Sequence, residues 1–312
     1  MIQSAALDSP ALALIVTGFL AAAVRVATPL LLAALGETLS ERAGVINLGL
    51  EGAMLAGALA AAVAGQASGP WAGTVAGIGA GILVSGGFAV VALGLGADQI
   101  ITGTAITLAS VGATGAIYRQ VYGPGGAGLG LRTFEPYAIP GLSRIPVLGP
   151  GLFDQPVLSY LGFVLAPVLA WLLFRTRWGL AVRASGESPD AARASGVRVR
   201  LVRLTAVLLG GALGGLAGAA LVLAQVGTFA ERMTAGRGFV AIAIVVLGRW
   251  YPWGVVLAAL VFGGATALQF VFQAMGLAVP YQLFLMLPYL LTLLALAGGI
   301  RRYAGPAALG RG

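Results

Sequence analysis

The 312-residue chain contains no cysteine, no histidine and no lysine. Without cysteine and histidine, disulfides, thiolate chemistry, imidazole catalysis and soft-metal sites are excluded. Without lysine there is no Walker A loop, which needs its lysine on the nucleotide phosphates, and no retinal-type Schiff base. Charged residues are also scarce, at 9% of the chain against about 25% in a typical soluble domain. Water is therefore not the only solvent that surrounds this chain.

Apolar residues dominate what remains: they make up 59% of the chain, and the mean hydropathy is +0.97. Apolar runs of roughly 17–25 residues, enough to cross a bilayer, recur along the whole length. The sequence predicts a single all-α transmembrane domain over 1–312, a polytopic bundle of about nine segments. Their approximate bounds are 11–35, 44–64, 71–93, 99–118, 157–174, 201–224, 238–248, 254–272 and 281–300. The seventh is too short to span alone, so it is either a half-helix or part of a span that starts upstream.

The arginines indicate how the bundle is oriented. Seven of the 18 lie in the loop 175–203, and placing this loop in the cytoplasm puts twelve arginines inside and five outside. This agrees with the positive-inside rule and predicts an external N-terminus, provided that 238–248 crosses the membrane. The net charge of +8 then reflects topology, because no stretch has the basic, aromatic-interleaved composition of a nucleic-acid-binding surface. In the external stretch 119–156, glycine and proline exclude a continuous helix, and the apolar residues favour a folded cap over a flexible linker.

The cytoplasmic loop carries the signals of a short helix. Ser188 suits an N-cap, Pro189 the first helical position, and Asp190 the positive end of the helix dipole. Gly196 is a natural stop, so the pattern predicts a helix of about two turns over 189–195. The alternative is a hairpin kept only for topology, which accounts for the arginines but not for a short helix with signals at both ends.

Three stretches resemble a known family and occur in the family's order. The loop GLAVRASGESPDAARASGV (179–197) resembles the cytoplasmic loop of ABC importer permeases, whose short coupling helix docks on the ATPase subunit. ERAGVINLGLEGAMLAGALAA (41–61) and GRGFVAIAIVVLGRWYPWGVVLAALVFG (236–263) resemble the sugar and nucleoside branch of these permeases. The sequences of these two stretches are most similar to those of nucleoside-type permeases, which work with lipoprotein receptors of the basic-membrane-protein type.

The resemblance implies that the chain is one of two transmembrane subunits of an importer in a bacterial or archaeal cytoplasmic membrane. Its implied partners are a separate ABC ATPase, a homologous but different second permease, and an external substrate-binding lipoprotein. No enzyme activity and no cofactor are expected on this chain. The implied solutes are nucleosides or related small polar molecules, with simple sugars as the alternative. The residues implied to contact the ATPase are Glu187, Ser188, Pro189, Asp190, Ala191, Ala192, Arg193, Ser195 and Gly196.

Polar residues inside apolar segments are candidates for the substrate pathway, because an ionisable group there costs roughly 2.5–3.5 kcal/mol. Asn47 comes one helical turn before Glu51, so we expect the two to share a helix face. They either line the solute route or form an interhelical hydrogen bond, with Arg25 a candidate partner of Glu51. Gln269 and Gln273, one turn apart beside phenylalanines, suit a nucleoside, although such a stripe is also common in plain packing.

Two further carboxylates, Glu37 and Glu41, are expected at the cytoplasmic rim, where solvation explains them. An alternative class is a secondary transporter driven by protons or sodium. It would need ionisable residues deep in several spans, and only Arg25 and Glu51 qualify. An intramembrane enzyme lacks candidate groups, since no carboxylate pair, metal cluster or nucleophile stands at catalytic spacing.

Overall fold

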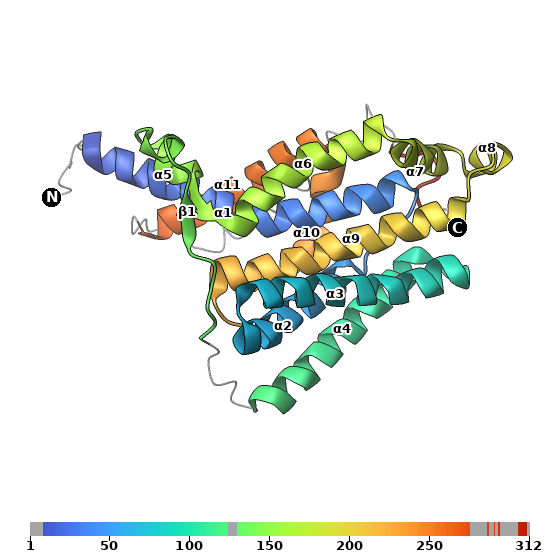
Figure 1. Cartoon of the computed structure of the whole chain (residues 1–312), viewed down its shortest axis with the longest axis horizontal. Coiled ribbons are helices and arrows are strands. Elements are labelled where there is room, and N and C mark those ends of the chain that lie inside the picture. The colour runs from blue at the N-terminus through green and yellow to red at the C-terminus, as the bar shows by residue number, and fades with distance from the viewer. Residues whose placement is uncertain are drawn as a thin grey trace.

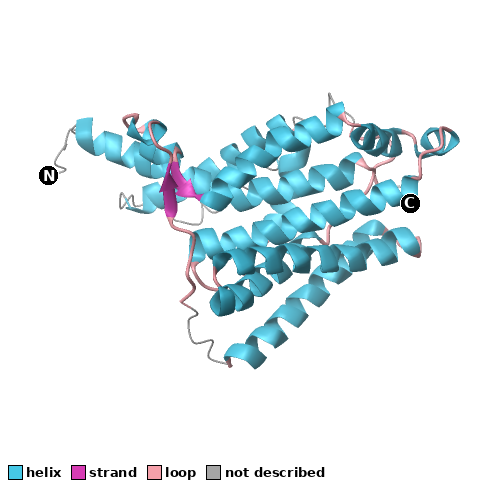
Figure 2. Ribbon diagram, viewed as in Figure 1, coloured by secondary structure: helices cyan, strands magenta, loops and turns pink. Residues whose placement is uncertain are grey.

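The computed structural model describes residues 9–123, 130–274 and 305–310, together with the single positions 286, 290 and 293. In this part of the chain, long helices run alongside one another and a small two-stranded sheet lies at one end (Figures 1 and 2). Seven helical segments of the described residues are long and apolar enough to cross a membrane. The predicted all-α membrane bundle is confirmed, while most of the ninth predicted segment, 281–300, lies outside the described residues.

Four long helices come first along the chain. They are α1 (Ser9–Arg42), α2 (Leu50–Ser68), α3 (Pro70–Ala89, continued by a π-helical turn Val90–Gly94) and α4 (Gln99–Tyr122).

The prediction that the second segment begins at residue 44 is wrong. Gly44 has φ +88°, and its N–H donates to the carbonyl of Glu41 while the N–H of Val45 donates to that of Ser40. These two bonds form a Schellman motif, which ends α1 at a glycine. The chain then continues without helix until Leu50.

The glycine- and proline-rich stretch that was expected to be external is folded where the structure describes it. Strand β1 (Pro136–Ala138) pairs antiparallel with β2 (Asp154–Pro156), and a 3-10 turn (Leu142–Arg144) and α5 (Leu148–Leu152) lie between them. We call residues 130–156 the cap; its sheet is the magenta pair in Figure 2. The strands were not predicted, because three residues are too few to show an alternating pattern.

At the opposite end of the bundle lie the helices of the arginine-rich loop (Figure 1). After α6 (Val157–Arg175) come α7 (Arg177–Glu187) and α8 (Pro189–Ala194). Helix α7 was not predicted, although its start carries a local signal: the Thr176 hydroxyl accepts from the N–H of Gly179 at 3.0 Å. We call α7 and α8 the coupling helices, and this end of the bundle the coupling end, after the role that the resemblance implies for this loop and that remains untested.

Helix α9 (Val199–Leu221, continued by a π-helical turn Val222–Val226) lies in the middle and packs on α1, α2 and α3. Its glycines allow backbone-to-backbone contact. A Cβ on Gly215 would stand 2.1 Å from the carbonyl oxygen of Gly77, and one on Gly218 2.0 Å from that of Met54. The small-residue spacing at 210, 214 and 218 is therefore used for close helix packing.

Helix α10 (Arg237–Leu247) is the short seventh segment, and α11 (Pro252–Ala274) follows it. At 1.5 Å per residue, α10 covers about half of a hydrocarbon core of about 30 Å. The residues before it begin at the cap, where the N–H of Leu131 donates to the carbonyl of Gly227 at 3.0 Å. The residues after it reach the coupling end, where Arg42 Nε donates to the carbonyl of Trp250 at 2.9 Å. The chain thus passes from one end to the other as a non-helical stretch followed by a half-helix.

Candidate functional site

Two of the three motif stretches meet inside the bundle. Glu51, on the first turn of α2, is 6% exposed. Its Oε1 accepts from the Thr234 hydroxyl at 2.6 Å and from the N–H of Gly236 at 2.9 Å, and its Oε2 accepts from the N–H of Gly238 at 2.6 Å. We call these four residues the interior junction.

The interior junction supplies hydrogen-bond acceptors to N–H groups at the start of α10. The first N–H groups of a helix have no partner within it, and the bilayer interior provides no water to satisfy them. A carboxylate at this position supplies acceptors and a negative charge that suits the helix N-terminus. Gly238 is required for the approach, because a Cβ there would lie 2.7 Å from Cα of Glu51. Gly236 has φ +82°, a conformation that side chains disfavour.

These contacts test two predictions about Glu51: its hydrogen-bond partner and the helix face that it shares with Asn47. Glu51 does form an interhelical hydrogen bond, but the proposed partner is wrong: the Arg25 side chain is exposed, and its Nε donates to the carbonyl of Ala21 at 3.4 Å. The expected shared helix face of Asn47 and Glu51 is also wrong, because Asn47 precedes the start of α2 at Leu50.

Asn47 instead belongs to a second buried group, which we call the Glu37 cluster: Glu37, Ser40, Asn47 and Ser85. The N–H of Asn47 donates to Glu37 Oε1 at 2.8 Å, and its Nδ2 makes a long contact to Ser85 Oγ at 3.5 Å. All four side chains are at most 1% exposed. Among the described residues, Glu37 Oε2, Ser40 Oγ and Asn47 Oδ1 have no hydrogen-bond partner.

The solvated rim position expected for Glu37 and Glu41 is wrong. Both are buried, and Glu41 Oε2 accepts a hydrogen bond from the indole N–H of Trp250. The signal that could have shown this is the spacing of Glu37 and Glu41, one turn apart on a helix that continues to Arg42. Trp250 and its neighbour Arg249 have φ of 53° and 57°, so the turn after α10 is backbone-strained and is held by this contact.

The two glutamines lie on α11, away from α2. Gln269 is 9% exposed, whereas the side chain of Gln273 lies outside the described residues. Helix α11 packs mainly on α1, α10 and α6, and α2 packs mainly on α3, α9 and α4. The described part of the chain therefore does not bring the four predicted pathway residues to one place. Nor does it gather three acidic side chains that could hold a metal ion.

The predicted coupling helix is present as α8 and ends at Ala194. Ser188 stands at the N-cap, but its side chain makes no capping bond; its carbonyl accepts from the N–H of Ala192 at 3.0 Å. At the other end Gly196 has φ +84°, and the N–H groups of Gly196 and Val197 donate to the carbonyls of Arg193 and Ala192. This Schellman motif confirms Gly196 as the stop.

The coupling helices enclose a shallow groove of about 410 Å³. Ala192 points into the protein and is 4% exposed, while Ala191, Arg193 and Ser195 are exposed. Among the predicted coupling residues, Ala192 thus packs α8 against the rest of the permease, and several others face outward.

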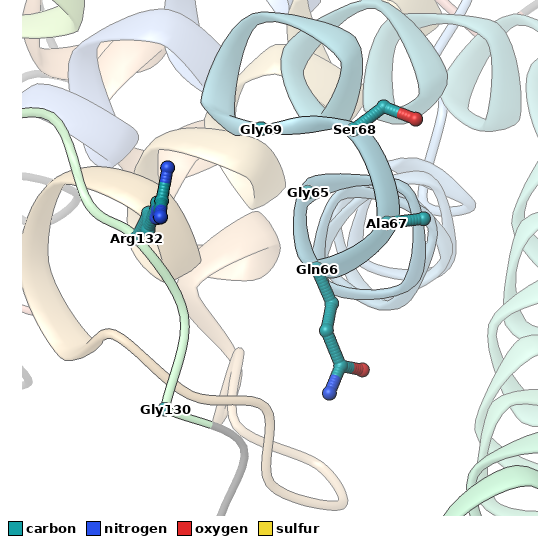
Figure 3. Close-up of a pocket in the computed structure, with 7 residues that line it drawn as sticks. All are labelled: Gly65, Gln66, Ala67, Ser68, Gly69, Gly130 and Arg132. Carbon is teal, nitrogen blue, oxygen red and sulfur yellow. The ribbon is translucent and has the colours of Figure 1, made fainter.

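At the cap end, sequence reasoning missed a polar pocket of about 450 Å³ (Figure 3). It lies where the α2–α3 turn meets the start of the cap, with Gln66 on one segment and Arg132 on the other. The Gln66 side-chain oxygen accepts from the hydroxyl of Tyr122 at 3.1 Å. No local pattern marks this pocket, because its two walls are far apart in the sequence.

Residues 19–296 match the family model described as the permease component of branched-chain amino acid transport systems. The chain is 38% identical over 294 residues to the guanosine ABC transporter permease NupQ of Bacillus subtilis, covering 91% of this chain and 92% of the relative. It is 36% identical over 293 residues to the nucleoside ABC transporter permease NupC of Lactococcus lactis, with the same coverage.

A relative with another solute is also similar. The putative glucose ABC transporter permease TsgC13 of Haloferax volcanii is 38% identical over 266 residues, covering 84% of this chain and 79% of the relative. No solved structure matches the chain.

Proposed function

The chain belongs to the family of permease components of branched-chain amino acid transport systems, and on this premise we propose that it is the membrane subunit of an ABC importer for nucleosides. The observation that carries the proposal is the similarity to a guanosine and a nucleoside permease over 91% of the chain. Glucose is the second candidate solute, because the putative glucose permease is equally identical over a shorter length.

The proposed energy source is a separate ATPase that docks on the outward face of α8. Ala192 is the buried residue of this short helix, whereas Asp190, Ala191, Arg193 and Ala194 are exposed and accessible to a partner. We propose a second, homologous permease and an external lipoprotein receptor as the other subunits. ATP binding would move the coupling helices, and the bundle would then open toward the receptor. Asn47, Glu51, Gln269 and Gln273 remain the proposed pathway residues.

Reconstitution of the permease with its ATPase, second permease and receptor in liposomes tests the proposal. We expect ATP-dependent uptake of labelled guanosine that exceeds uptake of labelled glucose. Preference for glucose would replace the nucleoside assignment with the sugar one. Solute uptake by the permease alone, driven by a proton or sodium gradient, would refute the importer proposal altogether.

The coupling role of α8 is tested by a matched pair at Gly196. Gly196→Pro removes the N–H that bonds to Arg193 and cannot adopt φ +84°, so uptake should be lost. Gly196→Asn is the control, because asparagine tolerates this conformation and keeps the N–H. Ala192→Asp should also abolish uptake, since it places a charge at a buried contact. Full uptake in Gly196→Pro and Ala192→Asp would mean that the loop serves topology only.

A further inference from the structure

The segment 305–310 lies at the coupling end, between α7 and the turn that follows α1. The N–H of Ala308 donates to the carbonyl of Gly186, near the end of α7, at 2.8 Å. The N–H of Gly310 donates to the carbonyl of Gly44 at 3.1 Å. Ala308 is 5% exposed, so the segment is packed into the protein and does not merely lie on its surface.

The same segment contacts the turn after α10. A Cβ on Gly305 would stand 2.8 Å from the indole ring of Trp250, so only a glycine lets the backbone lie this close to the ring. Trp250 in turn donates to Glu41 and accepts from Arg42 at the end of α1. One short segment therefore contacts the coupling helices, the break between α1 and α2, and the base of the half-helix.

Each of these three places leads along the chain from the coupling end toward the interior of the bundle. Gly186 directly precedes Glu187 at the end of α7, where the chain turns into α8. Gly44 begins the non-helical stretch that leads to Glu51, and Trp250 ends the turn that leads from α10. Glu51 and α10 meet in the interior junction, so both routes end at the same place.

We propose that residues 305–310 are a positioning element that transmits movement of the coupling helices to the interior junction. This inference rests on the proposed function. The segment needs no contact with ATPase or solute for this role. Its backbone hydrogen bonds and the buried side chain of Ala308 hold α7 and the turn after α1 in one arrangement, so that they move together.

The test compares Ala308→Gln with Ala307→Gln in the reconstituted complex. Position 308 is buried and position 307 exposed, so the same neutral side chain disrupts packing only in the first variant. ATP hydrolysis and solute uptake are measured together, and assembly is checked by co-purification of all subunits. A coupling free energy of 1–3 kcal/mol corresponds to a change of about fivefold or more. We expect Ala308→Gln to lower the solute transported per ATP by that factor, with assembly intact and Ala307→Gln like wild type.

A deletion of 305–312 is the second variant, and we expect it to show the same loss of solute per ATP. The proposal is overturned if Ala308→Gln keeps the wild-type ratio, including the case where uptake and hydrolysis fall in parallel. It is also overturned if neither variant assembles, because the segment would then be needed only for folding. Absence of ATP-dependent uptake in the wild-type complex would instead refute the proposed function.

Discussion

Glu37 and Glu51 are both carboxylates buried in the helical bundle, and they differ in what surrounds them. Glu51 accepts three hydrogen bonds through its two oxygens, from a segment more than 180 residues further along the chain. Glu37 accepts one, from Asn47, and its second oxygen has no partner in the described part of the structure. A buried charge is costly unless hydrogen bonds and opposite charge compensate it. The comparison shows that burial alone does not define a carboxylate's role.

Because their hydrogen bonds differ, we expect Glu51 and Glu37 to contribute differently to the stability of the bundle. Glu51 accepts from the N–H groups of Gly236 and Gly238 at the start of the half-helix, where the N–H of Arg237 donates instead to the carbonyl of Thr234. We therefore expect the loss of Glu51 to destabilise α10. Glu37 accepts one hydrogen bond, from the N–H of Asn47, so we expect its loss to have a local effect. Four substitutions test this contrast, ordered here by expected effect.

Glu51→Leu should have the largest effect. It leaves the Thr234 hydroxyl and the N–H groups of Gly236 and Gly238 without an acceptor, and each buried unsatisfied group costs about 1–3 kcal/mol. We expect loss of uptake and a clearly lower melting temperature of the detergent-solubilised permease. A variant that melts and transports like wild type would show that α10 does not depend on this carboxylate.

Glu51→Gln should be intermediate. The amide keeps one acceptor oxygen, but its NH₂ group must face at least one of the donors that the second carboxylate oxygen now accepts. We expect destabilisation by about 1–3 kcal/mol, measured by thermal unfolding, and reduced uptake. Wild-type stability and uptake would indicate instead that Glu51 is a tolerant position lining the route.

Asn47→Leu should have a smaller effect on stability and a distinct effect on uptake. The backbone N–H that bonds to Glu37 is kept, and only the long contact to Ser85 is lost, so the cost should be about 1 kcal/mol. If Asn47 lines the solute route, uptake should fall more than stability does. Unchanged rates for nucleosides and sugars would place the route elsewhere.

Glu37→Gln should have the smallest effect. The amide oxygen can keep the bond from the N–H of Asn47, and the NH₂ group replaces an oxygen that has no partner in the described part of the structure, so no hydrogen bond is lost while an ionisable group is removed from a buried site. We expect a melting temperature equal to or above that of wild type, within about 1 kcal/mol. Destabilisation as large as that of Glu51→Gln would remove the distinction between the two carboxylates.

Local sequence signals were sufficient to predict the helix α8 but not the contacts of the interior junction. Ser188, Pro189 and Gly196 lie close together in sequence and predict α8 to within a residue. The junction joins Glu51 to Gly238, and no periodicity relates residues so far apart. The stop at Gly44 was present in the sequence, but the second segment was predicted to begin there, because counting apolar residues passes through a glycine. Helix α7 was overlooked because its arginines already had an explanation in membrane topology.

The central place of α9 has a consequence for how the protein is made. Its partners α1, α2 and α3 all precede it in the chain, and their backbones contact its glycines directly. Chains emerge from the ribosome N-terminus first, at about 5–20 residues per second. The first spans therefore enter the membrane several seconds before the helix around which they pack. During that interval their glycine faces lack the helix on which they pack, so this part of the bundle is complete only once α9 has been made.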